Sequence, residues 1–293
     1  MNRFSLLLFG GLLLTFGSLH AQEFSYGFKA GLNFSSFSGP LEKDATGMEV
    51  EELEFESGFQ VAALFNIHLN EYFGIRPEFM YSQKGGRYRY NGPAYQFLMA
   101  DSGKEIVTTG DKKITLNITN SYIDIPVLAF VRPLEWLEFS AGVNVGFLVG
   151  STAAGELIYS GKSLAGGNVN EYSYTLEYNY YKDEETTADF ATTTVLTVDG
   201  EKVTLPFKAG AYYNLPKVDG SFFNVLDFGL NAGMSLYLNR SLFVGARFTY
   251  GLADVTNNDY DYSQLELDGN NQRIPRADTD RNLSIQTSVG FSF

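Results

Sequence analysis

The amino-acid sequence contains no cysteine. That absence excludes disulfide bonds, thiolate metal sites, cysteine nucleophiles and a lipoprotein anchor, which is attached to a cysteine. Beyond the first 22 residues there is also no long apolar run, whereas a helix needs roughly 20 apolar residues to cross a bilayer. Any part of the mature chain that spans a membrane must therefore use strands.

Positive charge is scarce: 21 Lys and Arg stand against 34 Asp and Glu, a net charge of −13. Arg3 is the only charged residue among the first 21, so the remainder carries 20 against 34, or −14. This excess of negative charge argues against nucleic acid as a partner.

Histidine is nearly absent, with His20 and His68 as the two in the chain. His68 falls near the end of an expected strand, beside a tight turn, and its parity points it inward. We interpret it as an interior polar residue and not as a catalytic base. The chain also has no Gly-x-Ser-x-Gly motif and no glycine-rich phosphate loop. We therefore expect no enzymatic activity and no cofactor.

The amino terminus has the pattern of a secretory signal peptide. Arg3 precedes an apolar run over 4–16, and the small residue Ala21 follows a few positions later. The run is too short to cross a bilayer as a helix. The sequence predicts a signal peptide over 1–21 and a single exported domain over 22–293.

Aromatic residues and glycine are abundant, with 25 Phe, 19 Tyr and 30 Gly, a composition that favours strands. The last segment, Leu283–Phe293, shows the clearest pattern. Its odd positions are mostly large and apolar and its even positions are small or polar, so one face of a strand would be apolar up to the terminal Phe293. Such a strand fits a barrel whose outer face meets lipid.

The same alternation recurs along the chain and predicts eight strands. These lie at about 24–37, 58–69, 73–84, 122–132, 137–149, 228–238, 242–252 and 283–293. Long connections follow the odd-numbered strands and short turns follow the even-numbered ones. This is the pattern of an all-β, eight-stranded antiparallel transmembrane β-barrel with long extracellular loops, in the outer membrane of a Gram-negative bacterium.

Two stretches outside these strands also carry patterns. Ile114, Leu116 and Ile118 alternate on the parity opposite to the outward residues of the fourth strand, which suggests a bulge or register change near 119–121. The longest connection, 151–224, contains a predicted hairpin of 192–198 and 201–207 around Asp199-Gly200, placed above the membrane. A ten-stranded barrel that recruits this hairpin is the alternative.

Several segments together resemble the PorT-type outer-membrane β-barrel family of small, porin-like barrels. They are Gly27–Phe34, Arg76–Gly85, Tyr122–Pro126, Ala246–Leu252 and Val289–Phe293. The resemblance covers the predicted strands and neither the third nor the fourth long loop. It implies location and architecture, and it transfers no activity. Proteins similar to this family include one needed for protein secretion.

Charged residues on the inward parity of the strands predict a network in the barrel lumen: Lys29, Arg76, Glu78, Asp124, Asp227 and Arg247. Eight strands enclose a space that side chains can fill, so an open diffusion channel is not expected. The network is interpreted as structural salt bridges. A path for ions or protons through the same groups is the alternative.

The long loops supply the remaining candidates. Tyr172, Tyr174, Tyr178, Tyr180 and Tyr181 could stack on a sugar or grip a protein, or could pack the loop itself. In the last loop, Asp254, Asp259 and Asp261 are weak calcium candidates whose spacing does not match an EF-hand, so no specific metal site is predicted.

The sequence thus leaves two classes of function open. The first is a structural or surface-interaction barrel that contacts lipid, surface polymer or protein through its loops. The second is a narrow conduit for ions or small solutes. The resemblance further implies that Phe291 and Phe293 form a signal read by the outer-membrane assembly machinery, and a monomer is expected.

Overall fold

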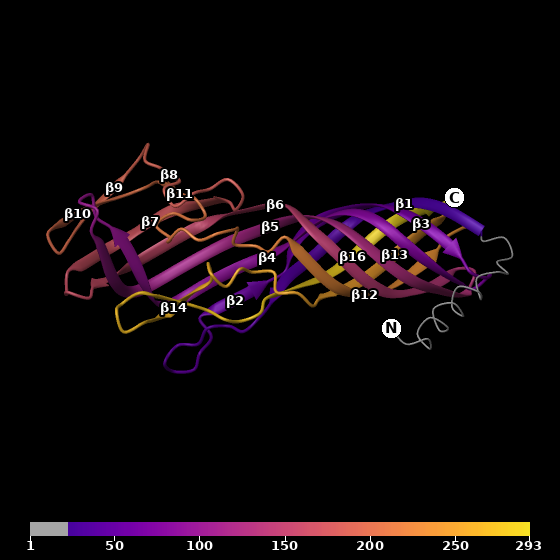
Figure 1. The fold of residues 1–293 in the computed structure, drawn as a ribbon, viewed down its shortest axis with the longest axis horizontal. Coiled ribbons are helices and arrows are strands. Elements are labelled where there is room, and N and C mark those ends of the chain that lie inside the picture. The colour runs from indigo at the N-terminus through magenta and orange to yellow at the C-terminus, as the bar shows by residue number, and fades with distance from the viewer. Residues whose placement is uncertain (1–22) are drawn as a thin grey trace, which may run out of the picture.

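The structure is a computed structural model that describes residues 23–293 as strands joined by turns and loops (Figure 1). The predicted signal peptide and its cleavage site lie outside the described residues. Within 23–293, no helix is long and apolar enough to cross a membrane.

Eight strands close into a barrel in which every neighbouring pair is antiparallel. They are β1 (Glu23–Ser38), β3 (Glu56–His68), β4 (Phe73–Met99), β5 (Glu105–Leu134), β6 (Leu137–Ser163), β12 (Leu226–Tyr237), β13 (Leu242–Gly251) and β16 (Arg281–Ser292). The ring closes where β1 pairs with β16, from Gly27 opposite Ser292 to Ser38 opposite Arg281. The predicted eight-stranded barrel is confirmed, and β6 pairs directly with β12, which leaves no place for the alternative hairpin in the ring.

The strands of this ring alternate as the sequence predicts. In β16, Ile285, Val289 and Phe291 are exposed on the outer face, whereas Gln286 and Gly290 are buried in the lumen. Period-two alternation places every second side chain on the same face of a strand. The barrel therefore has an apolar outer surface and a polar interior.

Three strands of the ring continue far beyond the barrel, which corrects two of the predicted loops. β4, β5 and β6 are 27, 30 and 27 residues long, so most of 85–121 and much of 151–179 is strand. Here the sheet gains β2 (Glu51–Glu54), β7 (Asn168–Asn179), β8 (Ala188–Asp189) and β11 (Lys208–Ala209). We call this part the extension. Figure 1 shows it at the end of the molecule opposite the C-terminus.

Two hairpins complete the extension. β9 (Thr194–Val198) and β10 (Glu201–Leu205) form a separate two-stranded sheet, with Asp199 at φ 52° and Gly200 at φ 82°. Positive φ at both central residues is the signature of a type I′ turn, so the predicted hairpin and its turn are confirmed. The second hairpin, β14 (Tyr262–Leu267) and β15 (Arg273–Pro275), lies in a segment predicted to be a polar loop.

The predicted register change near 119–121 is confirmed, although the extra residue lies in the partner strand β6 and the parity of β5 does not change. β5 pairs with β4 without a break from Asn120 to Asp124, and its even-numbered residues face inward along the whole strand. The register shift lies in the neighbouring strand, where Ser121 pairs with Gly150 and Tyr122 with Leu148, leaving Val149 as the extra residue. Ile114, Leu116 and Ile118 thus keep the inward parity. What changes is the interior, which is polar in the barrel and apolar in the extension.

Candidate functional site

Three clusters of ion pairs fill the lumen of the barrel. In the cluster nearest the short turns, Arg76 donates two hydrogen bonds to Glu138, at 2.7 and 2.8 Å. Arg132 donates to the same carboxylate at 2.9 Å, and the Tyr237 hydroxyl donates at 3.2 Å. The Arg76 guanidinium also lies 4.7 Å from the centre of the Phe130 ring.

The next two clusters lie farther along β4. Glu78 accepts hydrogen bonds from Lys29 at 2.9 Å and from Arg247 at 2.6 and 2.8 Å. Lys84 lies between Asp124 at 2.9 Å and Asp227 at 3.0 Å. All of these side chains are nearly or completely buried.

The six lumen residues predicted from the sequence therefore all belong to buried ion pairs, though not to one network. The predicted set lacked Lys84, Glu138 and Arg132, which lie on the inward parity of their strands and could have been found by that signal. A cavity of about 20 Å³ lies among Lys29, Arg76, Glu78 and Arg247. That space is about the size of one water molecule.

Aromatic and aliphatic side chains close the lumen toward the extension. Lys84 lies 4.5 Å from the centre of the Tyr122 ring, and Tyr122 has no exposed surface. Farther on, Phe37 stacks on Phe223, with ring centres 5.8 Å apart. These rings belong to one apolar cluster that continues through the extension.

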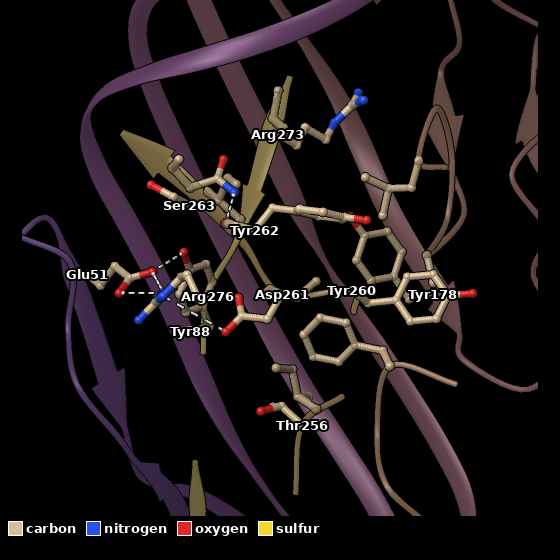
Figure 2. Close-up of a pocket in the computed structure, with 18 of the residues that line it drawn as sticks. Glu51, Tyr88, Tyr178, Thr256, Tyr260, Asp261, Tyr262, Ser263, Arg273 and Arg276 are labelled. Carbon is tan, nitrogen blue, oxygen red and sulfur yellow. Dashed lines mark hydrogen bonds and ion pairs between the residues drawn. The ribbon is translucent and has the colours of Figure 1, made fainter. Parts of the chain in front are cut away.

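The extension encloses a partly open cavity of about 300 Å³ (Figure 2). We call it the extracellular cavity. Strands β4 and β5 form one wall, and the last loop, including β14 and β15, forms another. Much of the lining is aromatic, including Tyr88, Tyr95, Phe97, Tyr174, Tyr178, Tyr180, Tyr213, Phe222, Tyr260 and Tyr262.

The structure divides the five candidate tyrosines among three environments. Tyr174, Tyr178 and Tyr180 line the extracellular cavity. Tyr172 is buried behind this wall, stacked on Tyr174 with ring centres 6.0 Å apart. Tyr181 lies on the outside, 46% exposed, and donates a hydrogen bond to the Leu148 carbonyl at 3.0 Å. The cluster thus both packs the extension and lines its cavity.

One end of the cavity carries positive charge. Lys112, from β5, is 5% exposed and donates hydrogen bonds to the Tyr95 carbonyl at 3.0 Å and to Gln264 Oε1 at 2.7 Å. Burial, together with the nearby Arg273 guanidinium, lowers the pKa of Lys112 to about 7. Arg273 lies over the Phe97 ring, 3.7 Å from its centre.

The other end carries a cluster of carboxylates. Asp261, Asp278 and Asp280 can bring one oxygen each within 4.8 Å of one another. Burial and the neighbouring Asp278 together raise the pKa of Asp261 to about 7 and that of Asp280 to about 6, against the opposing charge of Arg276. Arg276 donates to Asp278 at 2.7 Å. It also donates to Glu51 at 2.9 Å (Figure 2), so a fixed guanidinium already balances part of this charge.

Of the three calcium candidates in the sequence, only Asp261 belongs to this cluster. Asp254 accepts hydrogen bonds from the Asp280 amide and the Thr256 hydroxyl, both at 3.1 Å, and Asp259 is exposed. Asp278 and Asp280 were missed because they lie about 20 residues away in the sequence, and only the folded loop brings them to Asp261. The cluster offers oxygen ligands of the kind that calcium prefers.

His68 lies at the end of β3, partly buried, with its ring edge-on to Phe130 at 5.4 Å between centres. It is on the inward parity at the end of the barrel far from the extracellular cavity (Figure 1). Lys112 and Arg273, which carry positive charge into one end of that cavity, had no distinctive signal in the sequence. Both lie in segments predicted to be loops.

A closed antiparallel ring with an apolar outer face and a charged, filled interior defines a membrane-spanning β-barrel. The family model for the outer membrane protein beta-barrel domain matches residues 20–257. The chain therefore belongs to this family, and its place is the outer membrane of a Gram-negative bacterium.

Known structures of small barrels align along most of the chain. Ail, the attachment invasion locus protein of Yersinia pestis, is 8% identical, with a TM-score of 0.34, over 92% of this chain and 99% of its own. Neisserial surface protein A is 11% identical, with a TM-score of 0.31, over 93% and 100%. OprG from Pseudomonas aeruginosa is 8% identical, with a TM-score of 0.33, over 94% and 98%. No curated protein matches the sequence.

Proposed function

We propose that this barrel acts at the cell surface by binding through its extension, without catalysis. One observation carries the proposal: the charged clusters and rings occupy the lumen, whereas the extension holds a cavity of about 300 Å³. Small-molecule sites usually range from about 300 to 1,000 Å³ and combine apolar walls with a few polar groups. The space available for a ligand is thus in the extension.

A narrow conduit for ions or small solutes is the second candidate. It would need Glu78, Glu138 or Lys84 to leave a buried ion pair, and charges removed from such pairs are costly in a low-dielectric interior. Catalysis is a weaker candidate, because the one histidine in the described residues is at the far end of the barrel from the cavity.

Conductance and surface binding together test this proposal. Purified protein in planar bilayers should show no stable conductance steps. In cells, replacement of Gly155–Asp219 by a short Gly-Ser turn should abolish capture of surface polymer or protein, while the eight-stranded ring still inserts and resists heat in detergent. Stable conductance steps from the intact chain, or unchanged capture by the shortened one, would contradict the proposal.

Within its family, we propose that the chain belongs to the PorT-type group. Supporting segments such as Arg76–Gly85 and Tyr122–Pro126 lie in the barrel parts of β4 and β5 and supply Arg76, Glu78, Lys84 and Asp124 to the barrel interior. A profile built from PorT-type sequences should align these segments with its own third and fourth barrel strands. An alignment that misses them would leave only the broader family.

A further inference from the structure

Two cations from different strands meet at one end of the extracellular cavity. Lys112 belongs to β5 and Arg273 to β15, and both side chains line the same space. Within residues 23–293, Lys112 donates to two neutral acceptors and has no carboxylate within ion-pair distance. Its ammonium has three protons, so one donor remains after these two bonds.

Of the two cations, only Lys112 lacks a carboxylate partner in the part of the chain that the structure describes. Arg273 donates to the Asn214 carbonyl at 3.0 Å and forms an ion pair with Glu105 at 3.4 Å, and the Glu105 side chain is partly exposed. Glu42, the other carboxylate nearby, already accepts hydrogen bonds from the Ser263 hydroxyl at 2.5 Å and from the backbone N–H of Gln264 at 3.0 Å. A buried cation without a carboxylate is costly, and an anionic ligand group would supply the missing partner.

Flat rings surround these cations. Arg273 lies on Phe97, and Tyr174 and Tyr213 meet edge to face with ring centres 6.4 Å apart. In Figure 2 the side chains of Arg273 and Tyr262 extend in the same direction, one above the other. Such rings offer large, rigid contact area to another ring. The volume of about 300 Å³ limits the occupant to a small molecule.

The opposite end of the cavity sets the polarity of the ligand. Asp261 and Asp280 line it there, together with Arg276, which is bound to Glu51 and Asp278. A second negative group on the ligand would approach these carboxylates and be repelled. The cavity therefore suits one anionic group at one end of a ring.

We propose that the extracellular cavity binds a small aromatic monocarboxylate, with its carboxylate held by Lys112 and Arg273 and its ring packed against the aromatic walls. The inference rests on the proposed function, since it names the chemical class that this same cavity would take. The carboxylate accepts hydrogen bonds from the free donor of Lys112 and from the guanidinium of Arg273. Each charge-assisted bond contributes about 1.5–3 kcal/mol, or roughly 10- to 100-fold in affinity.

Calorimetry on the full chain in detergent micelles tests this with benzoate, benzyl alcohol and benzylamine as probes. Benzoate should bind saturably and most tightly of the three. Lys112→Met and Arg273→Met should each weaken benzoate binding roughly 10- to 100-fold and leave the weak binding of benzyl alcohol unchanged. Lys113→Met is the matched control, because this substitution removes the same charge from the neighbouring residue, which lies on the exposed face of β5.

Lys112→Met could lose binding because it fails to fold, and Lys112→Arg tests for this. The arginine changes the same position but keeps the charge, so it should retain most of the benzoate affinity. The proposal is overturned if the intact chain shows no saturable binding of benzoate, if benzylamine binds more tightly, or if Lys112→Met and Lys113→Met bind benzoate equally. Such a result would leave the proposed surface function standing, provided that bilayers remain silent and capture still depends on Gly155–Asp219.

Discussion

The barrel and the extension are built from the same strands and have opposite interiors. In the barrel, inward positions of β4 and β5 carry Arg76, Glu78, Lys84 and Asp124, while outward positions are apolar. Farther along β5, the inward positions carry Leu116 and Ile118, while the outward Thr115 and Asn117 are exposed. The parity of the strand does not change between the two regions.

The difference follows from the surroundings of each region. Lipid outside the barrel favours apolar outward residues, and the enclosed polar groups must then satisfy one another. Water outside the extension favours polar outward residues, so the interior is formed by apolar and aromatic side chains. The inward parity stays the same, but the apolar residues move from the outward positions in lipid to the inward positions in water. Substitutions should therefore have different consequences in the two regions.

The largest expected effect is in the barrel. Glu138→Ala leaves Arg76 buried without its carboxylate, and breaking such a pair costs about 3–5 kcal/mol of the free energy of unfolding. Urea titration of the refolded protein would measure it. Lys43→Ala is the control, because its pair with Glu49 is more than half exposed and should contribute at most about 1 kcal/mol. Equal losses of unfolding free energy in the two variants would contradict the greater importance of the buried ion pairs in the barrel.

In the extension, Phe223→Ala should be the severe substitution. Phe223 is 2% exposed and meets Tyr180 edge to face at 5.1 Å, so removing the ring leaves a cavity that costs roughly 3 kcal/mol. Limited proteolysis should cut the extension while the barrel remains heat-resistant in detergent. The exposed Phe207, replaced by Ala, should leave the digestion pattern unchanged. Joint loss of barrel and extension would show that the two regions unfold as one unit.

Deletion of Phe293 should affect assembly more than stability. Its ring is 62% exposed and lies 5.7 Å from Tyr26, and its amide donates to the Tyr26 carbonyl at 2.7 Å. We expect less membrane insertion in cells and nearly normal refolding in detergent, because the deletion removes little buried surface. Cell fractionation beside an in vitro refolding assay would measure both. Unchanged insertion would argue against the assembly signal at Phe291 and Phe293.

Gly200→Ala should have a smaller, local effect. Gly200 has φ of 82°, and a side chain in that conformation costs about 1 kcal/mol. Amide hydrogen exchange should show less protection of β9 and β10 and no change in the barrel. Gly269→Ala is the control, since a Cβ there meets nothing within 4 Å and the residue is not in that conformation. Equal exchange in the two variants would show that the turn does not hold the hairpin.

The smallest effect is a pH dependence of the extension. The pKa of Asp261 is raised from 3.8 to about 7 by burial and by the neighbouring Asp278 and Asp280, against the opposing charge of Arg276. The folded state therefore binds this proton more tightly than the unfolded state, so Asp261 contributes stability at low pH that is lost as pH rises through 7. Protection of β14 and β15 from exchange should increase between pH 8 and pH 5.

Asp261→Asn should flatten this pH profile, because the amide does not ionise. Asp259→Asn, at an exposed position of the same loop, should leave the profile as it is. A profile that is unchanged in Asp261→Asn would assign the pH dependence to Asp280, whose pKa burial raises to about 6.

The sequence by itself determined the barrel. Alternation over segments such as Leu283–Phe293 fixes which residues face outward, and the spacing of turns fixes the number of strands. Both signals are local, so they can be read without knowing which strands pair. The type I′ turn at Asp199-Gly200 was readable for the same reason, because its two residues carry the required backbone conformation themselves.

Only the tertiary structure decided the extension and its cavity. The inward residues of β4 and β5 change from charged to apolar where the surroundings change from lipid to water. A search for strands with an apolar outward face therefore assigns the extension parts of β4 and β5 to loops. Lys112, Asp261 and Arg273 come from separate segments, and they line one cavity because β14 and β15 fold against the extended strands. This arrangement depends on long-range packing, which local alternation does not encode.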